Sequence, residues 1–125
     1  MAVTHGTPTR NTIANVVAAI ADAGSGAAKL KIRDASNVVL ATITLADPSH
    51  SAASGGVAAL AGLPKSDTDA DASGTAANFI VTDSDDATVY GGSCGVGSGD
   101  LQLDTLAVVI HYVVTVVSGG YTAPP

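Results

Sequence analysis

The longest apolar stretch of the chain covers residues 105–117, TLAVVIHYVVTVV, and contains no charged residue, glycine or proline. β-branched residues dominate it, and these favour the pleated surface of a β-sheet. Both faces of a strand with this sequence are largely apolar, so the pattern predicts a strand that is covered on both sides. The stretch is too short to span a membrane, which takes roughly 20 apolar residues. We therefore expect it to anchor the core, with another sheet layer, the helix or a neighbouring subunit over its second face.

Upstream, the hydrophobic pattern predicts one helix. Apolar residues recur at helical spacing between Ile13 and Ile20, which gives one apolar stripe. Thr9 or Asn11 is placed to cap a helix over residues 11–23, and the glycines that follow end it. Residues 1–10 are polar, contain a proline and are expected to form a flexible N-terminal arm.

After the helix, the spacing of apolar residues changes to every second residue, and the sequence predicts a β-hairpin. Charged and apolar residues alternate strictly over residues 29–33, which is typical of a strand with one solvated face. A polar turn at residues 34–37 leads to a returning strand at residues 38–45. Pro48 ends that strand, because proline cannot donate a hydrogen bond to the ladder.

Short strand-like segments separated by turn residues continue to the C-terminus. A second hairpin turns at residues 83–86, an acidic loop is expected at residues 65–74 and a glycine-rich loop at residues 91–99. About seven to eight strands at regular spacing are typical of a sandwich or barrel. We predict a mainly β protein, an antiparallel, jelly-roll-like β-sandwich with one short N-terminal helix, in a single domain over residues 11–118 with a C-terminal tail at residues 119–125. The further strands are expected at residues 57–63, 76–82, 87–90 and 101–103.

Composition agrees with a strand-and-turn protein. Aromatic residues make up only 3% of the chain, so the core must be built from Val, Ile, Leu and Ala. All eleven acidic residues are Asp, which favours turns and caps. The net charge of -6 argues against nucleic-acid binding, and the single Cys94 excludes an intrachain disulfide. With no signal peptide, we expect a soluble protein made in a reducing compartment, and its low charge predicts burial against partners.

One motif resembles a catalytic one. Residues 91–95, GGSCG, match the G-x-S-x-G nucleophile elbow, with Ser93 as the nucleophile. That motif needs a helix directly after it, and the GVGSG sequence that follows cannot nucleate one. The loop also lacks the lysine of a P-loop and the third glycine of a dinucleotide fingerprint. Cys94 is a candidate reactive thiol, but no base lies near it in sequence. We expect a tightly turning or flexible loop, no catalytic residue and no cofactor site.

The densest acidic run is residues 67–71, in which Asp alternates with other residues as at the start of a calcium loop. An EF-hand loop needs Gly next and Glu at its twelfth position, where this chain has Ala72 and Asn78. We therefore expect a solvated acidic loop and no metal site. His111 lies inside the apolar stretch and is expected to be a hydrogen-bonded core or interface residue. The histidines share no metal-ligand spacing: they are His5, His50 and His111.

A basic stripe lies on the first predicted strand of this acidic protein. Such a stripe is usually a solvated face that protects a strand edge, and the alternative is that it docks an acidic partner. The N-terminal arm and the C-terminal tail are also candidates for contact, because termini are free to order on a partner. The candidate contacts with a partner or a neighbouring subunit are therefore Arg10, Lys29, Lys31, Arg33 and Tyr121.

Four segments within residues 28–104 occur in a recognisable order: AKLKIRD, VLATITLADPSHSAASGGVA, TAANFIVTDSDDATVYGGSCG and GDLQLDT. With the helix-like RNTIANVV segment before them, they make the chain resemble a family of small virion proteins of tailed bacteriophages. The shared features are a K/R-I-x-D strand, an L-A-x-x-x-L-x-D/N-P strand end, a W/F-x-x-x-D-S/A-D hairpin and a final G-D-L-x-L segment. The chain differs in having Phe79 where Trp is common, and in its long apolar last strand.

The resemblance implies a structural protein of the virion, and within that class we expect a capsid decoration or cement protein. Such proteins bind the completed shell, bridge its subunits and resist the internal pressure of DNA. The expected partners are the major capsid protein and neighbouring copies of the chain, without direct contact with nucleic acid or membrane. The expected location is the capsid surface, after synthesis in the host bacterial cytoplasm. The alternative is a tail- or fibre-associated protein or a host-attachment module, although scarce aromatic residues count against sugar binding. An enzyme lacks a complete set of catalytic residues.

Overall fold

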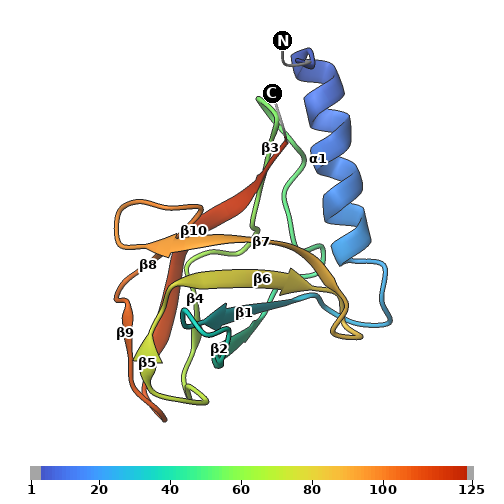
Figure 1. Ribbon diagram of the computed structural model, residues 1–125. Coiled ribbons are helices and arrows are strands. Elements are labelled where there is room, and N and C mark those ends of the chain that lie inside the picture. The colour runs from blue at the N-terminus through green and yellow to red at the C-terminus, as the bar shows by residue number, and fades with distance from the viewer. Residues whose placement is uncertain (1–3, 124–125) are drawn as a thin grey trace.

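A computed structural model describes residues 4–123 of the chain. One helix, α1 (Thr7–Ala21), stands beside a curled β-sheet, and the start of α1 lies at the same end of the molecule as the end of the last strand (Figure 1). The strands are β1 (Lys29–Arg33), β2 (Val39–Thr44), β3 (Val57–Ala59), β4 (Lys65–Asp67), β5 (Gly74–Thr75), β6 (Asn78–Thr82), β7 (Thr88–Gly95), β8 (Leu101–Leu103), β9 (Ala107–Val108) and β10 (Val114–Thr122).

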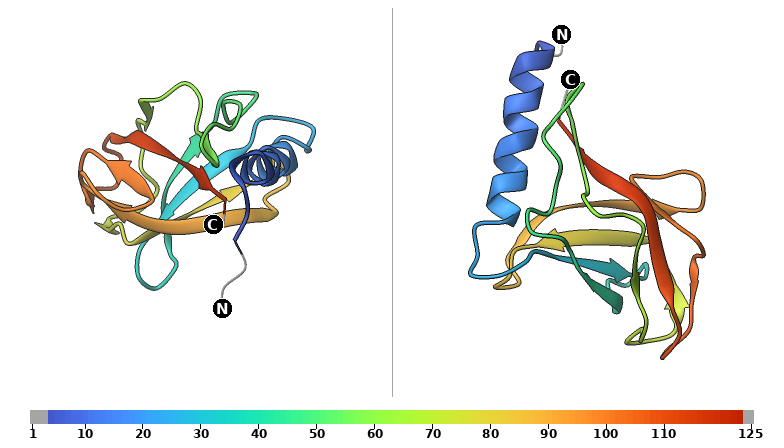
Figure 2. Two further views of the ribbon diagram at one scale, coloured as in Figure 1. Left: turned by 90° about the horizontal axis from the view of Figure 1, so that it is seen from above. Right: turned by 180° about the vertical axis from the view of Figure 1, so that it is seen from behind.

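The main sheet has the strand order β2-β1-β6-β7-β8-β10-β3, and β4 also pairs with β10. Neighbouring strands of this sheet run antiparallel, except β7 and β8, which run parallel. The sheet curls until β4 returns beside β2, where the Thr42 N–H donates to the Asp67 carboxylate at 3.1 Å. β5 and β9 form a separate pair. The mainly β fold with one N-terminal helix is confirmed, and it takes the form of one curled, mixed sheet (Figure 2).

The first predicted hairpin is confirmed, with Leu30 opposite Ile43 in the β1–β2 ladder. Leu30 and Ile32 are fully buried, whereas the three basic residues of β1 lie on its other face. The inner face of the sheet encloses one main core in which aliphatic side chains predominate, as the composition predicts. Its largest fully buried members are Phe79, Leu30, Ile32, Leu40, Ile43, Leu101, Leu103, Val81, Val114 and Val116.

Aspartate opens the turns of both predicted hairpins. The Asp34 carboxylate accepts two backbone N–H groups of its own turn, and Asp83 does the same between β6 and β7. Each turn then contains a non-glycine residue with positive φ, Asn37 at 66° and Asp86 at 67°. Short Asx side chains tolerate this geometry and supply its hydrogen bonds, which is why Asp is abundant here.

The helix begins earlier than predicted, so residues 7–10 of the expected arm are helical, while residues 1–3 lie outside the described part. Pro8 stands in the first turn, where its fixed φ and missing N–H cost nothing. The predicted caps and C-terminal end are also wrong. Gly6, rather than Thr9 or Asn11, is the N-cap. The helix ends at Ala21 instead of residue 23, with Asp22 as the C-cap.

The apolar stripe of α1 faces the body only in part. Small residues make the contact: Ala14 and Ala21 are buried, and Ala14 packs beside Ala58 of β3. Val16 and Ile20, in contrast, are 53% and 50% exposed. The helix therefore rests on the sheet mainly through alanines, with the half-buried Ile13 packed beside them, and leaves Val16 and Ile20 in solvent.

The single strand predicted over residues 105–117 is wrong. The chain forms β9, an exposed turn over residues 109–113, and then β10. His111 has a φ of 69°, which no regular strand contains, and its N–H donates to the Ala70 carbonyl at 2.9 Å. Tyr112 is 67% exposed, so the second face is not covered there. The acidic segment captures the backbone groups of the turn, and this tertiary contact overrides the strand propensity of the Val-rich sequence.

Two other predicted boundaries move in the same region. Gly91–Gly95 of the expected glycine-rich loop belong to β7, which leaves a shorter loop over residues 96–100. β10 continues through residues 119–122, so the predicted tail is mostly strand, and residues 124–125 lie outside the described part. Glycine is needed at position 120, since a Cβ there would lie 2.6 Å from the Ala58 carbonyl oxygen of the paired strand β3.

Candidate functional site

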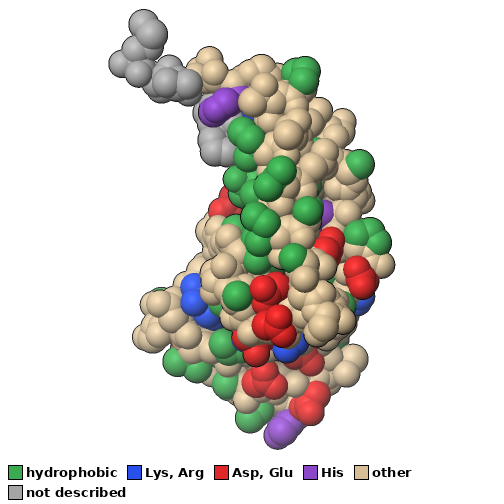
Figure 3. Space-filling model, turned by 90° about the vertical axis from the view of Figure 1, so that its right-hand side faces the viewer, with side chains coloured by type: hydrophobic (Ala, Val, Ile, Leu, Met, Phe, Trp, Pro, Cys, Tyr) green, Lys and Arg blue, Asp and Glu red, His purple; other side chains and the backbone are tan. Residues whose placement is uncertain are grey.

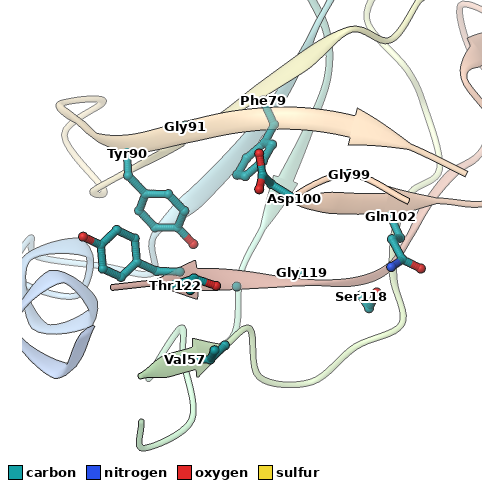
Figure 4. Close-up of a pocket in the computed structure, with 12 residues that line it drawn as sticks. Val57, Phe79, Tyr90, Gly91, Gly99, Asp100, Gln102, Ser118, Gly119 and Thr122 are labelled. Atoms are coloured by element: carbon teal, nitrogen blue, oxygen red, sulfur yellow. The ribbon is translucent and has the colours of Figure 1, made fainter. Parts of the chain in front are cut away.

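A cleft opens in the curled sheet between β7 and β10, beyond the first residue of β8. β8 lies between these two strands only over Leu101–Leu103, where it pairs with both. On the other side of Leu101, no strand of the described residues fills the space, and a cavity of about 420 Å³ remains. Figure 4 shows β7 and β10 on opposite sides of this gap. The lining residues are Val57, Phe79, Tyr90, Gly91, Gly99, Asp100, Gln102, Ser118, Gly119, Gly120, Tyr121 and Thr122.

Two tyrosines face each other across the cleft. Tyr90 comes from β7 and Tyr121 from β10, and their ring centroids are 5.2 Å apart in an edge-to-face arrangement (Figure 4). Tyr90 also contacts Phe79 edge to face, with the centroids 6.1 Å apart. Such aromatic pairs stabilise beyond the area that they bury. The rings therefore join β7 and β10 where β8 does not.

A buried polar chain holds Tyr90 in place. Its hydroxyl lies 2.8 Å from His50 Nε2, and His50 Nδ1 lies 2.7 Å from Ser49 Oγ. The Ser49 N–H donates to the Asp22 carboxylate at 3.0 Å, which ties the chain to the end of α1. Ser49 has no exposed surface, so its hydroxyl cannot meet a substrate. Burial, with Tyr121 adding to it, raises the pKa of Tyr90, so the phenol stays protonated at neutral pH. The chain positions a ring rather than forming a nucleophile.

His50 is expected to make the stability of the fold fall in mild acid. Burial lowers the pKa of His50 below 6.5, and the nearby Asp22 carboxylate only partly opposes this. The unfolded chain therefore takes up a proton on His50 at a higher pH than the folded protein does. This contribution is fully present above about pH 6.5 and is lost as the pH falls through the lower folded-state value.

The measurement is urea unfolding of the wild type and His50→Gln between pH 7.5 and 5. The variant should be less stable at pH 7.5, because it loses the Tyr90 contact, but the difference between the two proteins should shrink as the pH falls. A constant difference across this range would show that His50 does not titrate in the folded state below its unfolded value.

Asp100 places a carboxylate at the edge of the cleft. Its Oδ2 accepts the N–H and the Oγ–H of Ser93 at 3.0 and 3.1 Å. The side chain folds over Gly92, where a Cβ would lie 2.7 Å from Oδ2. Asp100 is exposed, and no basic side chain of residues 4–123 forms an ion pair with it. Ser93 thus lies in a strand, bound to a carboxylate, rather than at a strand-to-helix elbow.

Cys94 is half-buried beside Ser93. Burial raises the pKa of its thiol to about 11, so the thiolate is scarce at neutral pH. Because the thiolate is the reactive form, this environment suits a packing role better than nucleophilic chemistry.

The basic residues of β1 already have partners within the chain. Lys29 and Lys31 lie 3.3 and 3.1 Å from one carboxylate oxygen of Asp86. These contacts lower the pKa of Asp86, with the hydrogen bond from Lys31 the largest cause. Arg33 Nε donates to the Asn78 side-chain oxygen at 2.8 Å. The stripe therefore ties β1 to the second hairpin and its neighbours.

The other two expected contact residues also lie against the body. Arg10 donates from Nη2 to the Ala123 carbonyl at 3.2 Å, and its guanidinium lies against Gly56. Gly56 has a φ of 79°, which favours glycine, and a Cβ there would also come within 2.6 Å of Arg10 Cζ. Tyr121 faces the cleft. The structure thus brings Tyr121 to a candidate site and leaves the four basic residues apart from it.

The acidic segment acts as a turn. Asp67 lies in β4 and accepts the N–H of Asp69 at 2.9 Å, and Asp69 lies 2.7 Å from His111 Nδ1. His111 does not lie in the core, because its side chain is exposed; it is hydrogen-bonded as predicted, and its place in an interface stays a prediction. Within residues 4–123, no three His, Cys, Asp or Glu side chains are grouped as a metal site.

Two exposed apolar surfaces lie outside the cleft. We call Val109, Ile110, Tyr112 and Val113 the tip, and Val16, Ala19 and Ile20 the helix face; all seven residues are exposed. The tip follows β9, at the end of the molecule opposite the start of α1 (Figure 1). In Figure 3, hydrophobic side chains spread along the helix in the upper half, whereas most acidic side chains gather in the lower half.

The sequence interpretation missed most of the cleft. The sequence pointed to Ser93 and Cys94, which lie near the cleft, but it singled out neither Tyr90 nor Asp100. The available signal was that Tyr90 and Asp100 directly flank the glycine-rich residues 91–99, next to a predicted strand. The contact with Tyr121 depends on the sheet closing between distant segments, which no local pattern reveals.

No helix within residues 4–123 is both long and apolar enough to cross a membrane. Comparisons of the chain with protein-family models, with curated proteins and with solved structures found no match. Functional proposals for this chain therefore rest on its own surfaces and cleft, and on the resemblance expected from its sequence segments.

Proposed function

We propose that the protein is a non-enzymatic structural component of a bacteriophage particle, a decoration or cement protein that binds the assembled capsid and stabilises it. Two lines support the proposal. The segments quoted above resemble those of small virion proteins, and the fold is a compact β-sheet body without an evident catalytic group in the cleft. The expected partners are the major capsid protein and neighbouring copies of this chain.

The observation that carries the proposal is that the protein exposes two separate apolar surfaces, the tip at the end of the molecule opposite the start of α1 and the helix face on the second half of α1 (Figure 1). Each exposes apolar side chains that gain free energy when a partner removes them from water, at about 25 cal/mol per Å². A rigid body with two such separate surfaces can join two neighbouring subunits. Many copies on one shell act together, so each single contact can be weak.

The tip also favours a second candidate, a tail- or fibre-associated protein or a host-attachment module. Tyr112 is 67% exposed at the tip. A module that is anchored to the particle through its helix face would present this ring outward, as an attachment protein requires. Immunogold labelling of the phage that encodes the chain separates the two candidates, because it shows whether the protein lies on the shell or on the tail.

The direct test uses phage particles that lack this protein. They are expected to release DNA at a lower temperature and after weaker osmotic shock than complete particles, and the purified protein should rebind and restore their resistance. Particles that retain DNA equally well, with no rebinding of the purified protein to the shell, would contradict the cement function and favour the tail-associated candidate.

A further inference from the structure

We propose that the cleft between β7 and β10 is a docking slot for an extended, basic polypeptide segment of a partner protein, which adds one strand to the sheet in line with β8. This site is separate from the tip and from the helix face. The inference does not depend on the capsid proposal, because it follows from the strand register and the charge of the cleft.

The slot has the width of one strand. β8 pairs with β7 through Cys94 and Gly95, and with β10 through Val116–Gly119. Neighbouring strands lie about 4.7–4.9 Å apart, so β7 and β10 are separated by two such spacings where β8 lies between them. Beyond Leu101 the chain of β8 turns away into the loop, and the cavity continues its line between the same two strands (Figure 4).

On the β7 side, backbone groups point into the slot. The Cys94 N–H donates to the Ala77 carbonyl, on the side of β6, whereas the Ser93 N–H points the other way, to Asp100. Backbone groups alternate in direction along a strand, so Gly91 presents its N–H and C=O in the same direction as Ser93. Gly91 lines the cleft, and it has no side chain to obstruct a strand beside it.

On the β10 side, the same reasoning identifies Gly120 and Thr122. The Gly119 carbonyl accepts from Leu60, and the Ala123 N–H donates to Gly56, so both point toward the β3 side. Alternation turns the N–H and C=O of Gly120 and Thr122 to the opposite edge, where both residues line the cleft. The slot is thus bordered on both sides by backbone donors and acceptors, which are the groups that an added strand pairs with.

The charge of the slot indicates the chemistry of the segment. The exposed Asp100 carboxylate has no basic partner among residues 4–123, and the protein carries a net charge of -6. A Lys or Arg on the added strand would meet Asp100, while alternate side chains would point inward toward Tyr90 and Tyr121. At about 3.3 Å per residue, the stretch from Gly120 to Thr122 accommodates about three or four residues of strand.

A polypeptide fits the slot better than a sugar. Sugar platforms present an open aromatic face, but Tyr90 and Tyr121 contact each other edge to face, and the Tyr90 hydroxyl is already bound to His50. The backbone N–H and C=O groups that β7 and β10 present along the two sides of the slot can pair with an added strand, whereas a sugar has no use for their regular spacing.

The experiment selects binders from a library of random twelve-residue peptides, using the full-length protein, and measures the affinity of the enriched peptides by fluorescence anisotropy. Thr122→Pro removes one N–H that faces the slot, and Thr122→Val retains it as the matched control. Asp100→Asn keeps an acceptor for Ser93 but removes the charge. Hydrogen exchange of the Gly91 and Gly120 amides is followed with and without peptide.

We expect enriched peptides to alternate β-branched residues with Lys or Arg and to protect both amides. Affinity should fall at least tenfold in Thr122→Pro, remain within twofold in Thr122→Val, and fall severalfold with a weaker salt dependence in Asp100→Asn. If Thr122→Pro does not fold, N-methylation of alternate peptide amides on the wild type tests the same pairing. Failure to enrich basic peptides, unchanged affinity after N-methylation, binding of glycans in an array instead, or self-association that fills the slot would each overturn the proposal.

Discussion

Replacing Phe79 with alanine is expected to lower the free energy of unfolding by about 3–5 kcal/mol, the usual cost of removing a fully buried phenyl ring. Phe79 is the only phenylalanine of the chain, and its side chain is 1% exposed. It packs under Tyr90, so its loss opens a cavity beneath the cleft as well as in the main core. Urea unfolding followed by far-ultraviolet circular dichroism measures the change.

Val38→Ala is the matched control, because this valine lies in the first hairpin turn and is 50% exposed. Its stability should stay within about 0.5 kcal/mol of the wild type, as is usual for surface substitutions. A loss below about 1 kcal/mol in Phe79→Ala would mean that the core closes around the missing ring, and that the aliphatic side chains alone hold the sheet together.

The sequence predicted the local parts of this fold well. Strict alternation at Lys29–Arg33 identified β1 together with its buried face, because period-two burial is a local property of a strand. The turn that Asp34 opens was predicted for the same reason, since its hydrogen bonds connect residues that are close in sequence. The fold class follows from many such short strands and turns.

Non-local contacts explain where the prediction fails. The stretch over residues 105–117 has strand-like composition, yet the Ala70 backbone binds the backbone of His111 and Tyr112 and produces a turn. The apolar stripe of α1 predicted a helix, but alanines and Ile13 form the contact with the sheet. In both cases part of the hydrophobic residues that the pattern emphasised remain exposed, and these exposed residues form the surfaces that we assign to partners.

The cleft could not be derived from sequence, because it arises where one short strand ends. The length of β8 determines where β7 and β10 lose their common neighbour, and that boundary depends on the bond between Asp100 and Ser93. Tyr90 and Tyr121 are far apart in the chain and meet only because the sheet curls. Composition counted scarce aromatic residues against sugar binding but could not show that the fold gathers two of the three tyrosines in one place.

Charged substitutions on the helix face are expected to abolish particle stabilisation without unfolding the protein. Val16→Asp combined with Ile20→Asp changes two side chains that are about half exposed, so the melting temperature should change little. When this double variant binds the shell, the contact buries two charged carboxylates in place of two apolar side chains. Binding should therefore weaken by about 2–4 kcal/mol, or about 30- to 1,000-fold. Val38→Asp adds one of these two negative charges at an equally exposed valine outside both surfaces and should bind normally.

A second double variant, Tyr112→Asp with Val113→Asp, makes the corresponding change at the tip. If the protein joins two subunits, each double variant should still attach through its intact surface while failing to raise the temperature of DNA release. The variant with all four substitutions should neither attach nor stabilise. Cosedimentation with particles that lack the protein measures attachment, and dye-detected DNA release on heating measures stabilisation. Full stabilisation by either double variant would show that one surface is enough, and the bridging function would then be wrong.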